Sequence, residues 1–470
     1  MVKVTLTPVQ MDAVDSKGEH ILVKGVPGSG KTTVLMMKLQ NIIEKDTDSK
    51  ILFITYNKTL QSYIKEYLQE ELVGRGIRYD STNIQISTYH SWARGILSKL
   101  GYDKPPEQKA IFDAFYKGLT GTHRFYNNEK YKKFLIEEFN WIKNKGIQSF
   151  KEYKEIKRTG RGTALQAADR QKVYEILEKW DACLKRKNRY SWSDYANVLN
   201  RHIKEANEKF HYDYIFIDEA QDLAEIQLIT LRKSAHKGLV VAADLGQKIY
   251  KTDFTWKSVG INVLGGRTKV LNGAFRSTKE IMDLANSLLQ HDSTLSEEDL
   301  YQEYDAEKSG MLPSVLEAKS FKFENNLVAE IIKEIQHQSK LDGWDPIIGV
   351  LVFEHYKLDN WRKSLYINKL PSEIIHEDKG SVLTPGIKVL TMHGAKGLEF
   401  DYVIITGLSE KFPYTKNLLD DEMKQNIDIY RRLLYVSMTR AKENVYLTYK
   451  GKPSIYIGEL DKNLYEFYVV

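Results

Sequence analysis

Cysteine is almost missing from this chain of 470 residues, which contains only Cys183. A single cysteine cannot form an internal disulfide, so the sequence excludes a small scaffold held together by disulfide bonds. Cys183 lies in the apolar-periodic stretch VYEILEKWDACL, and we expect it to be a small side chain in or beside a core. We assign it no chemical role.

Long hydrophobic runs and low-complexity tracts are missing too. No apolar run approaches the ~20 residues that a membrane helix needs, and the first residues, MVKVTLTPVQMDAV, resemble neither a signal nor a transit peptide. With 42% hydrophobic and 28% charged residues, the composition is that of a globular rather than a disordered protein. We therefore expect a cytoplasmic protein without membrane contact.

Neither sign of charge dominates, since the net charge is only +6. Residues 101–210 are the exception, with 24 Lys and Arg against 15 Asp and Glu. In this segment the runs KEYKEIKRTGR and KRKNR are interleaved with aromatic residues, a mixture that suits a surface facing a polyanion. A solvated helical face accounts for the charge equally well, and both interpretations stay open.

What the chain does contain is a phosphate-binding pattern. Residues 25–33, GVPGSGKTT, match G-x-x-x-x-G-K-[ST] and lie between an apolar run, HILVKG, and a stretch with helical spacing, KTTVLMMKLQNII. In such a loop, backbone N–H groups and the lysine bind the phosphates, and the first threonine holds Mg²⁺. The pattern predicts a nucleotide site formed by Gly25, Gly28, Ser29, Gly30, Lys31, Thr32 and Thr33.

A second stretch, YDYIFIDEAQD, places Asp218 and Glu219 at the end of an apolar strand, where parallel sheets bind their ligands. We expect Asp218 to hold Mg²⁺ together with Thr32, and Glu219 to deprotonate the water that attacks the γ-phosphate, because both tasks need ionised oxygens. Further on, AADLGQKIY follows another apolar strand. It offers Gln247 as a sensor of the γ-phosphate, beside the ring of Tyr250.

The order of the expected elements indicates the fold class. Residues 1–100 and 205–270 alternate β-type runs with helices, as does the segment 271–470, which is the pattern of parallel sheets covered on both faces. Residues 101–204 have helical spacing throughout. We predict an α/β protein with two tandem domains and an α-helical insertion in the first.

A series of motifs in chain order resembles those of the UvrD/Rep/PcrA group of superfamily 1A DNA helicases. The motifs are TLTPVQ, GVPGSGKTT, FITYNKT, STYHSW, DEAQD, ADLGQKIY, FRST, TMHGAKGLEFDYVI and RRLLYVSMTRAK. The resemblance implies two RecA-like domains with ATP and Mg²⁺ in the cleft between them. It also implies movement along single-stranded DNA, 3′ to 5′.

The resemblance assigns roles to single residues as well. Around ATP it implies Gln10 and Phe275 at the adenine and Glu399 at the ribose. Arg276 and Arg440 would lie at the γ-phosphate, where a planar guanidinium suits charge spread over several oxygens. For the DNA strand, the resemblance implies contacts from Tyr56, Asn57, His90, Tyr250, Trp256 and His393.

The chain also departs from the family pattern. Its third motif has Leu245 and Gly246 where the family has acids, and its fourth begins NGAF in place of N-Y. Only about 110 residues separate Arg276 from Lys388, where full-length relatives carry a 2B domain. We therefore expect the 2B domain to be missing, and the insertion at 101–204 to correspond to the 1B domain of the relatives.

The sequence thus predicts an ATP-dependent DNA translocase or helicase that binds single strands and tailed duplexes, in repair or genome defence. A nuclease acting in trans is a candidate partner. Two alternatives stay open. One is a DNA-stimulated ATPase that remodels or recruits partners with little unwinding of its own. The other is an RNA motor, since stacking and phosphate contacts tolerate either sugar.

Overall fold

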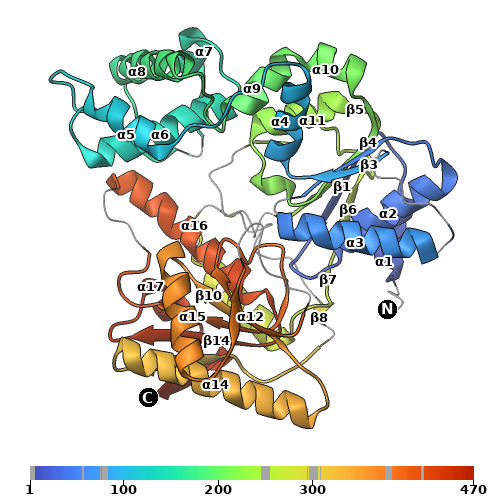
Figure 1. The fold of residues 1–470 in the computed structure, drawn as a ribbon, viewed down its shortest axis with the longest axis vertical. Coiled ribbons are helices and arrows are strands. Elements are labelled where there is room, and N and C mark those ends of the chain that lie inside the picture. The colour runs from blue at the N-terminus through green and yellow to red at the C-terminus, as the bar shows by residue number, and fades with distance from the viewer. Residues whose placement is uncertain are drawn as a thin grey trace.

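Two parallel β-sheets, each covered by helices on both faces, form two lobes (Figure 1). The computed structural model describes residues 6–55, 58–74, 76, 83–159, 161–244, 254–293, 295, 305–306, 308–375, 384–413 and 418–470. The predicted class, α/β with two tandem RecA-like units, is confirmed. Among the described helices, none is long and apolar enough to cross a membrane.

The first lobe is built on a six-stranded sheet. Its strands, in sheet order, are β3 (Ile84–Ser87), β2 (Ile51–Ile54), β4 (Tyr212–Ile217), β5 (Ala235–Ala243), β1 (His20–Gly25) and β6 (Thr268–Leu271). The helices of this lobe are α1 (Pro8–Asp15), α2 (Lys31–Lys45), α3 (Lys58–Gly74), α4 (Tyr89–Lys99), α9 (Asp194–Arg201), α10 (Ile203–Lys209) and α11 (Glu225–Ser234), with a 3₁₀ turn, η1 (Ala220–Asp222).

Successive strand residues of this sheet enter two different cores. Ile51 and Phe53 of β2 pack with α1, α2 and α3, whereas Leu52 and Ile54 pack with α4, α9 and α11. This is why the strands appear in the sequence as nearly continuous apolar runs, since both faces of a parallel sheet are buried. The carboxyl ends of β1 and β4 then lie at one edge, where the predicted phosphate loop and acidic pair begin.

The second lobe has a seven-stranded sheet. Its strands, in sheet order, are β11 (Ser372–Ile374), β12 (Gly386–Thr391), β10 (Ile347–Val352), β13 (Phe400–Ile405), β14 (Ala441–Lys450), β9 (Ser314–Ala318) and β15 (Glu466–Val469). One face carries α12 (Lys279–Leu289), α16 (Asp420–Met438) and α17 (Ile455–Glu459), and the other carries α14 (Phe321–Leu341) and α15 (Leu358–Ile367). The remaining elements are β7 (Gly273–Ala274), β8 (Asp305–Ala306), η3 (His355–Lys357) and η4 (Lys462–Leu464).

A group of helices with its own core lies between β3 and β4 in the chain. These are α5 (Lys109–Lys117), α6 (Glu129–Asn144), α7 (Phe150–Glu155) and α8 (Ala167–Arg186), here called the helical segment. Its core is rich in aromatic rings and includes the buried Cys183. The neighbouring α9 and α10 pack on the first sheet instead.

A buried cluster of charges joins the helical segment to the second lobe. Arg161, whose side chain is 1% exposed, donates to Glu138 at 2.9 Å and to Glu137 at 3.1 Å, and its Nη2 lies 3.2 Å from Glu422 of α16. Next to it, a Cβ on Gly162 would lie 2.5 Å from the carbonyl oxygen of Asp421, so the two backbones touch. Figure 1 shows the start of α16 reaching toward α5 and α6.

Candidate functional site

The predicted phosphate loop connects β1 to α2. Gly28 and Gly30 have φ of 75° and 83°, a region that glycine adopts without strain. Gly25 is fixed by space, because a Cβ there would lie 2.3 Å from Ser29 Oγ and 2.8 Å from the Leu271 carbonyl oxygen. Ser29 itself is fully buried, and Thr32 and Thr33 lie in the first turn of α2.

Lys31 is folded into this loop. Its Nζ donates to the carbonyl oxygens of Gly25 at 2.7 Å and Val26 at 2.9 Å, and lies 3.5 Å from Asp244 Oδ2. The side chain is only 8% exposed. The ammonium group is thus held at the mouth of the loop by two carbonyl oxygens and a more distant carboxylate, and phosphate oxygens would offer it further charged acceptors.

Asp218, directly after β4, contacts Thr32, the residue expected to hold Mg²⁺ with it. Thr32 Oγ1 donates to Asp218 Oδ2 at 2.7 Å. Burial raises the pKa of Asp218 to about 6, with Glu219 adding to the rise and Thr32 and Lys31 opposing it. The described residues contain no group of three or more metal-binding side chains. One hydroxyl and one carboxylate suit Mg²⁺, which takes its other ligands from phosphates and water.

Glu219 has a strained backbone and a charged neighbourhood. Its φ of 53° is unusual for a residue with a side chain and costs about 1–3 kcal/mol, as is common at functional sites. Its carboxylate accepts a hydrogen bond from Gln221 and lies 3.6 Å from Lys396 Nζ. Burial raises the pKa of Glu219, but Lys396, Lys31 and Arg440 outweigh it and leave the pKa below the ordinary value. Glu219 is therefore ionised, as a general base must be.

The second lobe supplies two arginines at the same edge. A Cβ on Gly28 would lie 2.6 Å from Arg276 Cβ, and Phe275 N donates to the Gly28 carbonyl oxygen at 3.2 Å, so this segment packs directly on the phosphate loop. Arg276 Nη2 lies 2.5 Å from Glu399 Oε1. Burial raises the pKa of Glu399, but the combined effect of Arg276, Lys442 and Arg440 is larger and opposite. The pKa of Glu399 therefore lies below the ordinary value.

Arg440 lies between α16 and β14 and is 2% exposed. Its Nε donates to the Val436 carbonyl oxygen at 3.0 Å. Burial lowers the pKa of Arg440 to about 10, and Arg276 lowers it too, while Glu219, Glu399 and Asp244 act in the opposite direction. The guanidinium stays charged at neutral pH and faces acids of both lobes.

The sequences of known proteins place this constellation in a family. Residues 6–255 match the model of the UvrD/REP helicase N-terminal domain, and residues 372–452 match the UvrD-like helicase C-terminal domain. The chain belongs to the UvrD/REP helicase family. It is a member that shares both halves of the family architecture, as the motif order predicted.

Individual helicases of the family are similar to this chain along most of its length. A probable DNA helicase II homolog of Mycoplasma capricolum is 22% identical, over 98% of this chain and 88% of that protein. A probable DNA helicase of Mycoplasma pneumoniae is 23% identical, over 92% of this chain and 80% of that protein. DNA helicase IV of Escherichia coli is 23% identical, over 98% and 70%.

Gln10, expected at the adenine of a UvrD/REP helicase, is hydrogen-bonded to the phosphate loop. Its Nε2 donates to the Ser29 carbonyl oxygen at 2.9 Å, and its Oε1 accepts from Thr7 N at 2.9 Å at the start of α1. A Cβ on Gly30 would lie 2.5 Å from Gln10 Nε2. Phe275 folds over the backbone of Gly273, where a Cβ would lie 2.2 Å from the ring.

The residues expected to contact DNA lie in different environments. Tyr56, Asn57 and Tyr250 lie outside the described residues, as does Gln247, the expected sensor of the γ-phosphate. Trp256 is partly buried against the core of the first lobe, with its ring 5.2 Å from Phe254. His393 lies 5.9 Å from the Phe353 ring, and burial, followed by Lys396, lowers its pKa.

His90, on the first turn of α4, is the expected DNA residue with the most distinctive environment. Burial, followed by Arg94, lowers its pKa to about 4, so the ring is neutral. The ring lies 5.2 Å from that of Trp192, edge to face, and Trp192 is 45% exposed. Sequence reasoning did not single out Trp192, because its partner His90 lies about a hundred positions earlier in the chain.

Lys396 is the residue of the candidate site that the sequence analysis missed most clearly. Within the described part of the chain it is fully buried, and it donates to Asp222 of η1 while lying 3.6 Å from Glu219. The signal was present, since Lys396 stands inside TMHGAKGLEF and Asp222 inside DEAQD. Gln221 of the same turn also accepts from Asp244 N at 3.1 Å, so η1 links β4 to β5.

Proposed function

We propose that this chain hydrolyses ATP in the cleft between its lobes and uses the energy to move along single-stranded DNA, 3′ to 5′. The observation that carries the proposal is the packing of Arg276 on Gly28, which brings a second-lobe arginine onto the first lobe's phosphate loop. A site shared by two lobes is complete only when they are together. Binding and hydrolysis are thereby coupled to relative movement of the lobes.

Each polar group of the cleft has a task in this proposal. Lys31 and the loop N–H groups bind the phosphates, and Glu219 takes the proton of the attacking water. Arg276 and Arg440 stabilise the negative charge that develops on the γ-phosphate. Thr32 and Asp218 would hold Mg²⁺, which neutralises phosphate charge when it is bound. Gln10, Phe275 and Glu399 are proposed for the adenosine moiety.

The domain limits are proposed as they follow from the sequence: 1–100 with 205–270 as the first ATP-binding domain, 101–204 as a helical 1B-like insertion, and 271–470 as the second domain. We propose that the family's 2B domain is missing. The match to the Mycoplasma capricolum protein spans 666 aligned positions, more than the 470 residues of this chain, which supports a shortened architecture.

That shortening favours one alternative, a DNA-stimulated ATPase that translocates or recruits a partner while separating duplexes poorly. ATP hydrolysis and strand displacement should be measured with single strands, 3′-tailed, 5′-tailed and blunt duplexes, and RNA. The proposal expects ATPase stimulated by DNA single strands and opening of 3′-tailed duplexes. If DNA stimulates ATP hydrolysis but no duplex opens, the result supports the alternative. If RNA stimulates ATP hydrolysis more than DNA does, RNA is the strand along which the protein moves.

The chemistry is tested separately with Glu219→Gln. This variant should bind Mg-ATP nearly normally and lose hydrolysis by ~100-fold or more, since a positioned general base contributes about 10²–10⁴. Lys31→Ala should instead weaken both binding and turnover, because the ammonium also contacts the phosphates before reaction. Near-normal turnover in Glu219→Gln would show that Glu219 is not the general base.

A further inference from the structure

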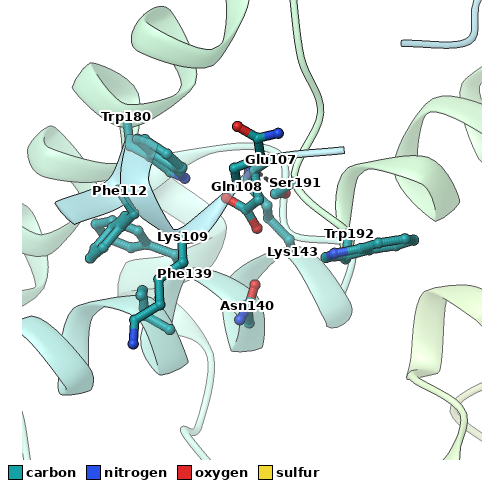
Figure 2. A pocket seen from close by; sticks show the side chains of 11 residues that line it. Glu107, Gln108, Lys109, Phe112, Phe139, Asn140, Lys143, Trp180, Ser191 and Trp192 are labelled. Atoms are coloured by element: carbon teal, nitrogen blue, oxygen red, sulfur yellow. Dashed lines mark hydrogen bonds between the residues drawn. The ribbon is translucent and has the colours of Figure 1, made fainter. Parts of the chain in front are cut away.

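A pocket of ≈ 230 Å³ lies at the helical segment (Figure 2), and none of its lining residues belongs to the candidate nucleotide site. Its lining comes from the loop before α5, from α5, α6 and α8, and from the loop that precedes α9. Pockets for drug-sized ligands measure roughly 300–1,000 Å³. The space therefore fits a single ring system and is too small for a nucleoside triphosphate.

One wall of the pocket is aromatic. Phe112, Phe139 and Trp180 are buried, and the ring of Phe112 meets that of Trp180 edge to face at 5.1 Å and that of Phe139 at 6.4 Å. Figure 2 shows Trp180 and Phe112 on one side of the pocket and Trp192 on the opposite side. Such a wall favours a flat, apolar face on the ligand.

Two amide groups give the pocket a polar side. Gln108 makes no side-chain hydrogen bond within the described part of the chain, and Asn140 uses only its Oδ1, which accepts from Ser193 Oγ at 3.2 Å. By contrast, Lys143 is committed to Asp181 at 2.6 Å and Asp194 at 2.8 Å. Each amide can both donate and accept hydrogen bonds, as the edge of a nucleobase can.

The surroundings of the pocket suit a polyanion. Arg189 donates to the Pro106 carbonyl oxygen at 2.7 Å, so the exposed residues 185–187, KRK, lie beside the loop that enters the pocket. On the other side, Trp192 contacts His90, a candidate for the DNA strand. A strand bound at both His90 and the basic residues would lie near Trp192, which lines the pocket.

We propose that this pocket binds one nucleobase turned out of a bound nucleic acid strand, with its face on the aromatic wall and its edge on Gln108 and Asn140. Glu107 also lines the pocket, and burial raises its pKa above the ordinary value. The inference rests on the proposed function in one respect, because it takes the strand to pass His90. It adds a base-reading contact outside the two lobes.

Photocrosslinking tests the proposal directly. Single-stranded DNA carrying 5-iododeoxyuridine at successive positions is bound to the full chain without ATP and irradiated, and the crosslinked peptides are mapped by mass spectrometry. The proposal expects a crosslink within 107–112, 136–140 or 180–192. Crosslinks elsewhere with none in these peptides overturn it. The measurement needs no hydrolysis, so pocket crosslinks support the site even if ATPase is not stimulated by DNA.

Two variants and one control complete the test. Ile136→Trp fills the pocket and should abolish the crosslink and lower single-strand affinity about 5- to 150-fold, the worth of one stacked base. Gln108→Leu, at an exposed position that leaves the core untouched, should lower affinity a few-fold. Ile331→Trp, at an equally half-buried helix position in the second lobe, is the control and should bind like the parent. Unchanged affinity and crosslinks in both pocket variants overturn the proposal while leaving the ATPase motor intact.

Discussion

The ammonium group of Lys396, in the second lobe, lies 3.6 Å from the carboxylate of Glu219 in the first lobe and donates a hydrogen bond to Asp222. All three side chains are at most 10% exposed, so their charges act on one another with little screening by water. The proposed base of one lobe is thus tuned by a cation of the other. The pKa of Glu219 depends on whether the lobes are together.

Replacing Lys396 should move the pH profile of ATP hydrolysis. Lys396 lowers the pKa of Glu219, so Lys396→Met should raise that pKa and shift the acid limb of the profile to higher pH. Lys396→Arg keeps the charge and should keep the limb near its original position. Rates measured between pH 5 and 9 decide the matter, and identical acid limbs for the parent and Lys396→Met would contradict the link.

Arg440→Lys should abolish most of the turnover that DNA stimulates. The ammonium keeps a charge but cannot donate in a fixed fork, and arginine fingers contribute about 10³–10⁵ to turnover. Binding of single strands without nucleotide should survive. Arg431→Lys is the matched control, since Arg431 is also a buried arginine, in α16, and is paired with Glu459 at 2.7 Å. Equal losses in both variants would indicate a structural role for Arg440.

Asp218→Asn should stabilise the nucleotide-free chain at alkaline pH. Burial raises the pKa of Asp218 to about 6, so the fold favours the neutral acid, and this contribution to stability is lost as the pH rises through that value. A tenfold change in the acid dissociation constant corresponds to about 1.4 kcal/mol. Tm measured at pH 5 and pH 8 should show a gain for Asp218→Asn that is larger at pH 8.

Asp292 provides the contrast to this variant. It is buried and paired with Arg432 at 2.8 Å, so Asp292→Asn should lower Tm by leaving a buried charge without its partner. An Asp218→Asn variant that loses stability at pH 8, as Asp292→Asn is expected to, would show that the carboxylate at position 218 is compensated by its neighbours.

The basic run at the end of α8 should contribute phosphate contacts. Replacing Lys185, Arg186 and Lys187 with Ala should lower affinity for a tailed duplex and flatten the plot of log affinity against log salt by about 0.7 to 0.9 per lost contact. Arg189 is left in place, because it holds the Pro106 carbonyl oxygen. Alanine at Lys322, Lys333 and Lys340 of α14 removes equal charge from the second lobe and should leave the slope unchanged. An unchanged slope in the α8 variant would identify its lysines and arginine as a solvated face.

The fold could be predicted from the sequence wherever a pattern of residues is typical of one type of local structure. Apolar runs such as YDYIFI, four of whose six residues are buried, are typical of inner parallel strands, and glycines with crowded backbones fix the phosphate loop. The strand β15 was not predicted, because all four of its residues are exposed and carry no apolar alternation. The contact between Lys396 and Asp222 could not be predicted from a local sequence pattern either, because the two residues are 174 positions apart.

The cluster around Arg161 has a mechanical consequence. The helical segment continues into the first lobe through its backbone, and Arg161 fastens it to the second lobe through Glu422. A buried ion pair does not stretch gradually, because partial separation leaves charges without partners. When the proposed nucleotide cleft opens, the ion pairs of Arg161 must therefore either break together or stay intact while the lobes rotate about them. In the second case the helical segment connects the two lobes at the hinge.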